Sequence, residues 1–466
     1  MFKKVPTGGI TISREGGHTQ HMAITDHLSP DVQAMILAKY SRDISPVLDR
    51  LPNSAESYAD HVAKLGKYYR DWGHKSVGQL ASTTIFFENV SILAAKVIED
   101  HPLFNGQECS TRYIDCSNQP MVEPMILSVS GTEDQQIIAH FISSWQHAFQ
   151  GFYTHALPIQ LEHNRRLFPR DESTSETQWN NAINAYTFDQ LRGWLPGGMC
   201  TNVAFTSTFD TINDHFGRMM MSPLHECQDI GVTTIQQLRE QYPTAAIDLE
   251  KLSVRNHYLV HPSFHYSSSV SGTGIQVQSY QSTNTLADII RARKPHQKFP
   301  LPVDMQVGRM SYSDTIDFAG YRDLHRHRNG LITFPRLTPE LGMHEYYFES
   351  LAPELKSKAE YLLSSFSQLS TSLLESFDGA PIDELQYCVP IGFKISFTYQ
   401  CEMSQAMYIG ELRSQQTVHP TLRSVAQSWM CQLKICFPEL SLAGIDLSPS
   451  LFSLLRGKQT LNVETK

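Results

Sequence analysis

The feature that most constrains this chain is a weak internal repeat. Two histidine-containing turns, GHKS at 73–76 and PHQK at 295–298, each follow a helical pattern. Each turn precedes a predicted strand and helix and then a second histidine motif, DHP at 100–102 or RHR at 326–328. A duplicated α+β unit is the economical explanation of this recurrence.

The repeat continues further along the chain. LRGWLP at 191–196 and LQYCVP at 385–390 each precede an aromatic-rich stretch and then an arginine, Arg218 or Arg413. A chain of 466 residues is also too long for one ordinary hydrophobic core, so more than one domain is expected.

Two polar stretches separate the regular patterns. Residues 163–181 are charged and without a period, and we interpret them as an insertion inside the first half. Residues 260–285 are rich in Ser, Gly and Thr and mark the domain boundary. The sequence therefore predicts two tandem units, residues 1–255 and 256–466.

Local patterns predict the elements around the motifs. Aromatic and apolar residues at spacings of three and four predict a helix that starts after Ser54, a suitable N-cap, and ends at Gly73. The β-branched and aromatic run at 81–90 predicts a strand, and 91–100 returns to a helical period. Residues 353–379 predict a long amphipathic helix that is stopped by glycine.

Composition and charge exclude several classes of protein. The formal charge of −9 and the pI near 6.1 argue against a general affinity for nucleic acid or anionic membranes. Eight scattered cysteines without a CxxC pair indicate reduced thiols. The N-terminus lacks the apolar run of a signal peptide, and no stretch approaches the roughly 18 apolar residues of a membrane span. We therefore predict a cytoplasmic protein.

NGQECSTRY at 105–113 is the first stretch that could carry chemistry. Glu108, Ser110 and Arg112 alternate, so in an extended segment they would share one face. A serine hydroxyl, neighbouring backbone N–H groups and an arginine fork would form a phosphate cradle, and the glutamate could accept from a sugar hydroxyl or an amide. A polar edge strand with a surface ion pair explains the same residues.

The second stretch, YRDLHRHRNG, is strongly basic. On a helix, Arg326, His327 and Arg328 would point about 100° apart, whereas a strand or a helix end would put both arginines on one side. On a helix Arg322 would face His325 and Arg326, and like charges there cost stability. Such a cluster usually has an anion to neutralise it, but a solvated basic face explains it equally well.

The remaining motifs are less specific. His74 and Ser76 in GHKS fit either a ligand contact or a helix stop followed by an N-cap. The chain has no Walker loop, no GxGxxG after a strand, no HExxH and no GxSxG. The His-Glu pairs at 225–226 and 344–345 lack the second histidine of a zinc site, so no metal is predicted.

Together, the order and spacing of these motifs resemble the flavin-dependent thymidylate synthases, whose signature RHRxxSxxxSxRY follows a GHxS/T turn. The resemblance covers residues 41–230 and, more weakly, 290–430, so the chain looks like two fused α/β units of this family that form a pseudo-dimer. The first half keeps the end of the signature, ECSTRY, and the second half keeps its start, RHR. Because the losses are complementary, we expect one composite site between the two units.

The resemblance implies roles for individual residues. The catalytic residues are Arg326, Arg413 and Ser110, of which Ser110 orients the nucleotide and does not attack it. The flavin-binding residues are Arg326, His327, Arg328, Ser41, His74, Ser76 and Gln79, where Gln79 stands in the place of a frequent glutamate. The substrate-binding residues are Glu108, Ser110, Thr111, Arg112, Arg192 and Arg413; Gln386 takes the place of Arg192 in the second half.

The function implied is C5 methylation of dUMP to dTMP, with FAD as cofactor and methylenetetrahydrofolate and NADPH as co-substrates. Ser110, Arg112 and Arg192 would neutralise the phosphate, while Arg326, Arg328 and Arg413 would stabilise enolate-like charge on the pyrimidine.

Three alternatives stay open: a hydroxymethylase, an enzyme for dCMP or another pyrimidine nucleotide, and a non-catalytic nucleotide- or flavin-binding protein. Binding of RNA or DNA sits badly with the acidic balance. The family's tetramer implies a homodimer of this fused chain, a pseudo-tetramer.

Overall fold

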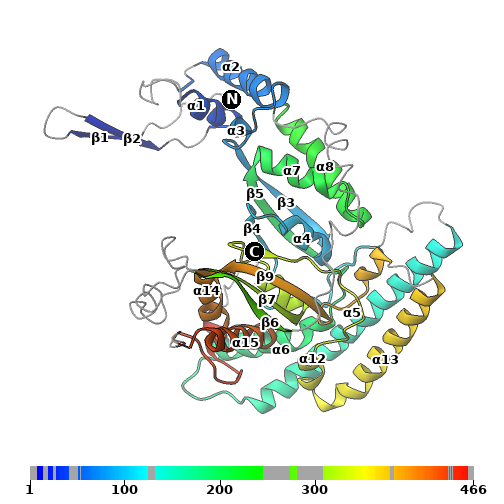
Figure 1. The fold of residues 1–466 in the computed structure, drawn as a ribbon. Coiled ribbons are helices and arrows are strands. Elements are labelled where there is room, and N and C mark those ends of the chain that lie inside the picture. The colour runs from blue at the N-terminus through cyan, green and yellow to red at the C-terminus, as the bar shows by residue number, and fades with distance from the viewer. Residues whose placement is uncertain are drawn as a thin grey trace. The chain divides into compact units, whose positions relative to one another are not determined.

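The computed structural model describes residues 8–13, 19–24, 28–40, 51–52, 54–123, 132–244, 273–280, 308–377, 382–438, 440, 442 and 444–459. Within them the chain is a mixture of helices and sheets, an α+β fold (Figure 1). It divides into two compact units that are interleaved in sequence. The first compact unit is Met1–Phe87, Val97–Gln107 and Val203–His261, and the second is Glu88–Lys96, Glu108–Asn202 and Pro262–Lys466. The compact units are built from interleaved segments, whereas the predicted tandem units 1–255 and 256–466 are consecutive. The tandem units stay a prediction.

The first compact unit contains a hairpin, a helical segment and most of a small sheet. Its hairpin and sheet strands are β1 (Gly8–Ser13), β2 (Thr19–Ile24), β3 (Ser82–Ser91), β4 (Asn105–Glu108) and β5 (Cys200–Thr208), and β3, β4 and β5 extend across the division between the units. Its helices are α1 (Pro30–Tyr40), α2 (Ala55–Leu65), the π-helix Gly66–Asp71, α3 (Lys75–Gly78), the end of α4 (Ile92–Glu99), α7 (Phe209–Met219) and α8 (His225–Gln241).

The helix predicted after Ser54 is confirmed. The Ser54 hydroxyl accepts from the Ser57 N–H at 3.1 Å, which caps α2, and the π-helix continues the segment to a turn at Gly73. Gly73 has a φ of +70°, a left-handed conformation that favours glycine at a helix end.

The second compact unit contains a four-stranded sheet and long helices. Its strands are β6 (Gly274–Tyr280), β7 (Gly308–Asp317), β8 (Leu331–Ile332) and β9 (Lys394–Glu402), in the order β6-β7-β9-β8. Its helices are the start of α4, α5 (Glu133–Leu167), α6 (Glu176–Leu191), the 3₁₀ turn Arg192–Trp194, α11 (Phe318–Leu324), α12 (Glu345–Glu349), α13 (Pro353–Ser376), the 3₁₀ turn Asp383–Tyr387, α14 (Met403–Arg413), α15 (Pro420–Cys436) and α16 (Leu455–Gln459).

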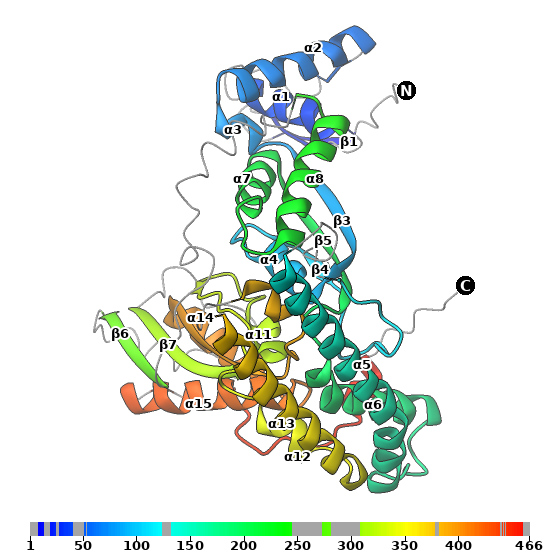
Figure 2. The same ribbon diagram turned by 90° about the vertical axis from the view of Figure 1, so that its right-hand side faces the viewer.

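Aromatic packing joins the helices and the sheet of the second compact unit. Helices α5 and α13 run side by side (Figures 1 and 2), and the rings of Trp145 and Phe366 meet edge to face at 5.0 Å between them. On the sheet, Trp429 of α15 stacks on Tyr312 of β7 at 4.8 Å. Phe366, Tyr312 and Trp429 are fully buried and Trp145 is half-buried, so these contacts form part of the close-packed core of the unit.

The same order of elements recurs in the two halves of the sequence. The three strands β3-β5-β4 have the order of β7-β9-β8. The ten-residue strands β3 and β7 lead directly into α4 and α11, and the nine-residue strands β5 and β9 lead directly into the eleven-residue helices α7 and α14.

Inside the second compact unit, the two predicted repeat segments pair with each other. Pro196 and Pro390 form an antiparallel bridge. Gly197 N–H donates to the Val389 carbonyl at 2.9 Å, and Ile391 N–H donates to the Leu195 carbonyl at 2.8 Å. Each residue of one bond has its counterpart 194 positions away in the other (197 and 391, 195 and 389). The backbone therefore has a local two-fold relation at LRGWLP and LQYCVP.

The structure bears on three expectations from the sequence. Residues 163–181 are partly helical and not without regular structure, because α5 continues to Leu167 and α6 starts at Glu176; their role as an insertion stays a prediction. The helix predicted at 353–379 is confirmed as α13, but its glycine stop, like PHQK at 295–298, lies outside the described residues. In the part of the chain that the structure describes, no helix is long and apolar enough to span a membrane.

Candidate functional site: an arginine cluster in the second compact unit

The structure brings most of the predicted site residues into one compact unit. Of the predicted residues, the second compact unit holds Glu108, Ser110, Thr111, Arg112, Arg192, Arg326, His327, Arg328 and Arg413. They come from both halves of the sequence. His74, Ser76 and Gln79 belong to the first compact unit, where Gln79 Nε2 donates to Asp210 at 3.3 Å. Ser41 lies outside the described residues.

The ECSTRY segment does not form the extended face that its alternation predicts. Strand β4 ends at Glu108, and the chain turns over Thr111–Ile114. Ser110 Oγ accepts the Arg112 N–H at 3.3 Å, which closes the turn. Glu108 and Arg112 therefore separate and meet different partners.

Glu108 is buried between two cations. Lys96 lies 3.1 Å from its carboxylate, and Arg322 forms a second, shorter ion pair with it. Arg322 also donates to Thr111 Oγ at 3.4 Å. Arg322 thus pairs with a residue more than 200 positions earlier and not with the helical neighbours predicted for it, because a buried guanidinium needs an anion.

Arg112 is held by Asp189 of α6. Its Nε and Nη2 donate to the two carboxylate oxygens, each at 2.9 Å, in a bidentate pair. Arg456 of α16 donates to the same carboxylate and to the Ala185 carbonyl at 3.2 Å. Sequence reasoning missed both Asp189 and Arg456. The spacing of Asp189 and Arg192 at one helix end could have indicated Asp189 as a site residue, but no local pattern indicates Arg456.

RHR lies just past the end of α11. Arg326 is exposed, while His327 is buried. Arg413 Nε donates to His327 Nε2 at 2.8 Å, and because a guanidinium only donates, the neutral imidazole carries its proton on Nδ1. Burial and the charge of Arg413 lower the pKa of His327 to about 3. His327 is therefore an uncharged spacer between cations.

Asp323 is the anion at the centre of these cations. Arg192 Nη1 lies 3.2 Å from its carboxylate, and Arg413 Nη2 donates to its carbonyl at 2.9 Å. Burial raises the pKa of Asp323, but the charges of Arg192, Arg112 and Arg413 outweigh it and hold the pKa well below its usual range. Asp323 is therefore ionised. It is a further residue that sequence reasoning missed, although it lies three positions before Arg326.

The arginine cluster, defined as Arg112, Arg192, Arg326, Arg413 and Arg456, exceeds its counter-ions. Five guanidinium groups face the carboxylates of Asp189 and Asp323, and the buried Asp317 also acts on Arg192, which leaves a formal excess of two positive charges.

Three buried donors at this place form no hydrogen bond of good geometry among the described residues, although the Tyr347 hydroxyl lies close to Arg192. They are Nε and Nη2 of Arg192 and the hydroxyl of Tyr346. The Tyr346 ring packs at 5.2 Å on His419, whose Nε2 donates to the Asp189 carbonyl at 3.0 Å. Both Arg192 and Arg112 act electrostatically on the Tyr346 phenol. Since these unpaired groups are donors beside excess positive charge, the arrangement fits an anionic ligand.

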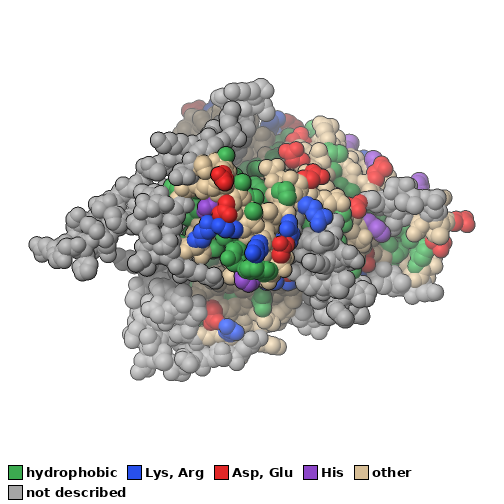
Figure 3. All heavy atoms as spheres, turned by 90° about the horizontal axis from the view of Figure 1, so that it is seen from above, with side chains coloured by type: hydrophobic (Ala, Val, Ile, Leu, Met, Phe, Trp, Pro, Cys, Tyr) green, Lys and Arg blue, Asp and Glu red, His purple; other side chains and the backbone are tan. Residues whose placement is uncertain are grey.

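Charge is mixed on one face of the molecule (Figure 3). On the face drawn in Figure 3, the described Lys and Arg side chains are interspersed with Asp and Glu and form no broad basic area. Among the described residues, no group of three or more His, Cys, Asp or Glu is arranged to hold a metal ion.

Comparisons with known proteins agree with the resemblance that the sequence motifs predict. Residues 24–244 match the family described as thymidylate synthase complementing protein. UPF0159 proteins of Chlamydia muridarum and Chlamydia pneumoniae are 22% and 23% identical, over 85% and 80% of this chain and 86% and 79% of their own length. A UPF0159 protein of Thermoplasma acidophilum is 19% identical over 88% of this chain and 93% of its own. The match over residues 24–244 confirms the family resemblance predicted from the motifs of the first half.

Proposed function

We propose that the protein is a flavin- and folate-dependent methyltransferase that converts dUMP to dTMP at the arginine cluster. The observation that carries the proposal is the meeting of Arg112 and Arg192 from the first half with Arg326 and Arg413 from the second, with an excess of positive charge and orphaned buried donors. A nucleotide monophosphate is a dianion, and it would supply the missing acceptors.

The residues divide into two parts by chemistry. Arg112 and Arg192 would bind the phosphate, with the Tyr346 hydroxyl as a further donor beside them. Arg413 would stabilise negative charge on the pyrimidine, and it would have to exchange its bonds to His327 and the Asp323 carbonyl for bonds to the ligand. Ser110 would orient the nucleotide through the turn that it closes before Arg112.

FAD fits part of this arrangement. Arg326 is exposed and forms no ion pair among the described residues, so it can meet a pyrophosphate, and Arg328 is half-buried beside it. His327 is engaged by Arg413 and contributes shape and no charge. A bound flavin would supply the redox chemistry, and the chain's own residues would bind and orient the substrates.

The tandem arrangement also belongs to this proposal. We infer that the two halves descend from one unit and form a pseudo-dimer, on the basis of the repeated strand order and the reciprocal bonds around Pro196 and Pro390. By the family resemblance, two such chains would associate as a homodimer.

The test is direct. The purified protein should show flavin absorbance or take up added FAD, and it should form dTMP from dUMP, methylenetetrahydrofolate and NADPH. Arg112→Ala and Arg326→Ala should each abolish turnover. Arg309→Ala is the matched control, because Arg309 is 73% exposed and pairs with Glu402 on a strand of the same unit. A protein that binds no FAD and forms no product would overturn the proposal; a hydroxymethyl product, or turnover of dCMP alone, would replace the reaction but keep the site.

A further inference from the structure

A short strap, defined as residues 451–457, places Arg456 against the ECSTRY turn in the second compact unit. The Gln178 side chain of α6 donates to a backbone carbonyl of the strap at 3.3 Å. The ring of Phe452 stacks on Phe168, which follows α5, with 4.4 Å between the ring centroids. The strap is therefore attached to the helices of the unit at two points before the chain reaches Arg456.

The close approach of the strap to α6 requires a glycine. A Cβ at Gly457 would lie 2.1 Å from the backbone carbonyl oxygen of Gln178, so the strap would have to shift to accept any side chain at this position. Gly457 is buried and follows Arg456 directly. It thus fixes how closely Arg456 approaches α6.

Arg456 contacts the turn and its counter-ion together. Its Nη1 donates to the Asp189 carboxylate and to the Ala185 carbonyl, the second bond at 3.2 Å. Its Nη2 lies 3.5 Å from the Arg112 carbonyl oxygen, and its guanidinium carbon lies 5.2 Å from the centroid of the Tyr113 ring, within cation–π range. Because these partners all belong to the chain, Arg456 acts through other residues and not on a ligand.

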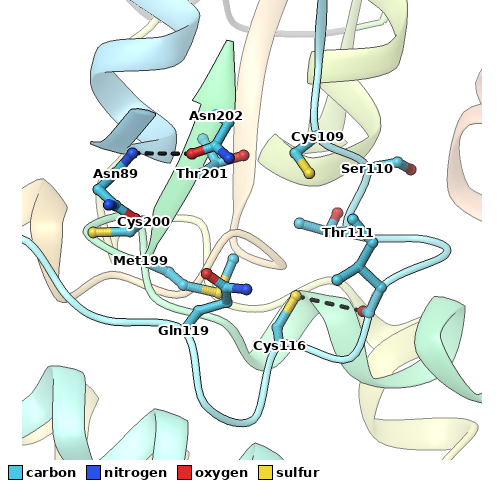
Figure 4. A pocket seen from close by; sticks show the side chains of 11 residues that line it. Asn89, Cys109, Ser110, Thr111, Cys116, Gln119, Met199, Cys200, Thr201 and Asn202 are labelled. Atoms are coloured by element: carbon cyan, nitrogen blue, oxygen red, sulfur yellow. Dashed lines mark hydrogen bonds between the residues drawn. The ribbon is translucent and has the colours of Figure 1, made fainter. Parts of the chain in front are cut away.

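The turn itself has two sides. In Figure 4, Thr111 points from the turn toward the pocket drawn there, and Ser110 also lines that pocket. Arg112 and Tyr113 do not line it. Arg456 therefore contacts the side of the turn that belongs to the arginine cluster.

Arg112 is held so that one part of its guanidinium group stays available. Its Nε and Nη2 donate to the two oxygens of Asp189, each at 2.9 Å, and Nη2 also donates to the Thr417 carbonyl at 3.2 Å. Its Nη1 forms no hydrogen bond among the described residues. The two N–H groups of this nitrogen are the donors that an anionic ligand can bind.

Arg456 also decides how much of the charge of Arg112 is neutralised. A 1:1 pair of Arg112 and Asp189 would carry no net charge, whereas two guanidinium groups on one carboxylate leave one net positive charge. Burial and the charge of Arg112 lower the pKa of Arg456, which reflects a repulsion between the two cations. A bound anion would relieve this repulsion.

We propose that Arg456 is a positioning residue of the anion site: by sharing Asp189 it leaves positive charge on Arg112 and keeps Nη1 of Arg112 available to a dianionic phosphate. The inference rests on the proposed function in one respect, that the arginine cluster binds the phosphate of a nucleotide. It adds that the affinity depends on a residue 344 positions away from Arg112 in the sequence.

The test measures the binding of dUMP and of inorganic phosphate to the full chain by calorimetry. In Arg456→Gln the amide can still donate to the Ala185 carbonyl, and Asp189 stays paired with Arg112, so no buried charge loses its only partner. Both probes should bind about 10-fold more weakly to this variant, the effect of one charge-assisted hydrogen bond. In turnover the KM for dUMP should rise while kcat changes little, because the lost interaction acts on the bound substrate and the transition state alike.

Three further variants separate charge from structure. Arg456→Lys keeps the charge without the planar fork and should restore most of the lost affinity. Gly457→Ala keeps Arg456 but displaces the strap, so it should weaken phosphate binding as Arg456→Gln does, and it takes the place of that variant if Arg456→Gln does not fold. Arg309→Gln, which removes a charge at a 73% exposed position of the same unit, should leave the affinity unchanged. Urea unfolding of each variant shows whether the protein is folded under the conditions of the binding measurement.

The other outcomes are also decisive. Equal phosphate affinity of the wild type and Arg456→Gln, a loss that Arg456→Lys does not restore, or an equal loss in Arg309→Gln would overturn the inference. A wild type that binds neither dUMP nor phosphate would overturn it together with the anion site. Phosphate binding that depends on Arg456, without formation of dTMP, would refute the proposed function and support the inference, whereas formation of dTMP with an affinity independent of Arg456 would do the reverse.

Discussion

Replacement of the shared carboxylate at position 189 is the sharpest test of the arginine cluster. Asp189→Asn keeps the shape of the side chain but removes the charge that holds Arg112 and Arg456. The side chains of Asp189, Arg112 and Arg456 are 3%, 11% and 6% exposed, so solvent cannot replace the lost partner. Removing one partner of a buried ion pair costs about 3–5 kcal/mol. Because two guanidinium groups lose their anion here, we expect a loss at the upper end of that range.

Urea unfolding followed by tryptophan fluorescence measures this loss. Trp194 and Trp429 are fully buried in the second compact unit, so they report on the part of the molecule that the change affects. Glu162→Gln is the contrasting control, since its pair with Arg166 spans 3.9 Å and both side chains are 62% exposed. Such a pair contributes less than about 0.5 kcal/mol. If Asp189→Asn lowered the free energy of unfolding by less than about 1 kcal/mol, the cluster would not depend on its counter-ion and the reasoning would be wrong.

Three further predictions concern single groups. Tyr346→Phe should weaken the binding of phosphate or dUMP, measured by calorimetry, about 10-fold, as expected for the loss of one hydrogen bond to an anion. The control Tyr361→Phe, at a 73% exposed position, should not change the affinity. Equal affinities of the two variants would contradict the role of the Tyr346 hydroxyl. His327 has a folded pKa of about 3 and an unfolded pKa near 6.5, so its contribution to stability is complete above about pH 6.5 and is lost as pH falls toward 3, by at most about 1.4 kcal/mol per pH unit. The difference between the urea midpoints at pH 7 and pH 5 should therefore be smaller in His327→Gln than in the wild type. An unchanged difference would contradict this role of His327. Gly193→Ala would place a Cβ 2.5 Å from the Tyr347 ring and should cost about 1–3 kcal/mol by overpacking, and an unchanged melting temperature would refute this.

The local elements around the motifs could be predicted because they follow from short-range chemistry. Ser54 caps its helix, Gly73 takes a positive φ, and the β-branched run at 81–90 pairs as β3. The complementary division of the signature could also be predicted, and its two parts, Arg112 and Arg326, do lie in one compact unit.

The helix ends within 163–181 could not be predicted because they bury no apolar side chain; in this range only Asn164 is fully buried. Gln160 and Asn164 of α5 are both fully buried and donate to Gln190 of α6 at 3.0 and 2.7 Å. Asn164 also donates to Thr187 at 2.8 Å. A helix end whose buried contacts are amides adds nothing to the apolar stripe in the sequence, so hydrophobic periodicity fails there although the hydrogen bonds are satisfied.

The partners of the arginines could not be predicted for a different reason. Alternation placed Glu108 and Arg112 on one face, but a buried carboxylate is directed by the cations available to it, and these come from Lys96 and Arg322. Arg456 lies at the far end of the chain and reaches Asp189 through the docking of α16 on α6. Long-range charge pairing of this kind leaves no periodic trace in the sequence.

The local two-fold relation gives the arginine cluster a corresponding place 194 residues further along the chain, and the two places differ in charge. Position 189 corresponds to Asp383, and Arg192 corresponds to Gln386, each 194 residues away. Asp383 pairs with Arg336 at 2.7 Å, so one carboxylate faces one guanidinium there. Gln386 accepts from the Leu337 N–H at 2.9 Å and donates to the Asp383 carbonyl at 3.1 Å, so its amide is used by the backbone. At Asp189, by contrast, the two guanidinium groups of Arg112 and Arg456 share one carboxylate, and Arg192 adds donors that form no hydrogen bond among the described residues. Under the proposed duplication, the two copies keep the same aspartate but differ in its guanidinium partners and in the change from Arg192 to Gln386, and this asymmetry would decide where a dianion binds.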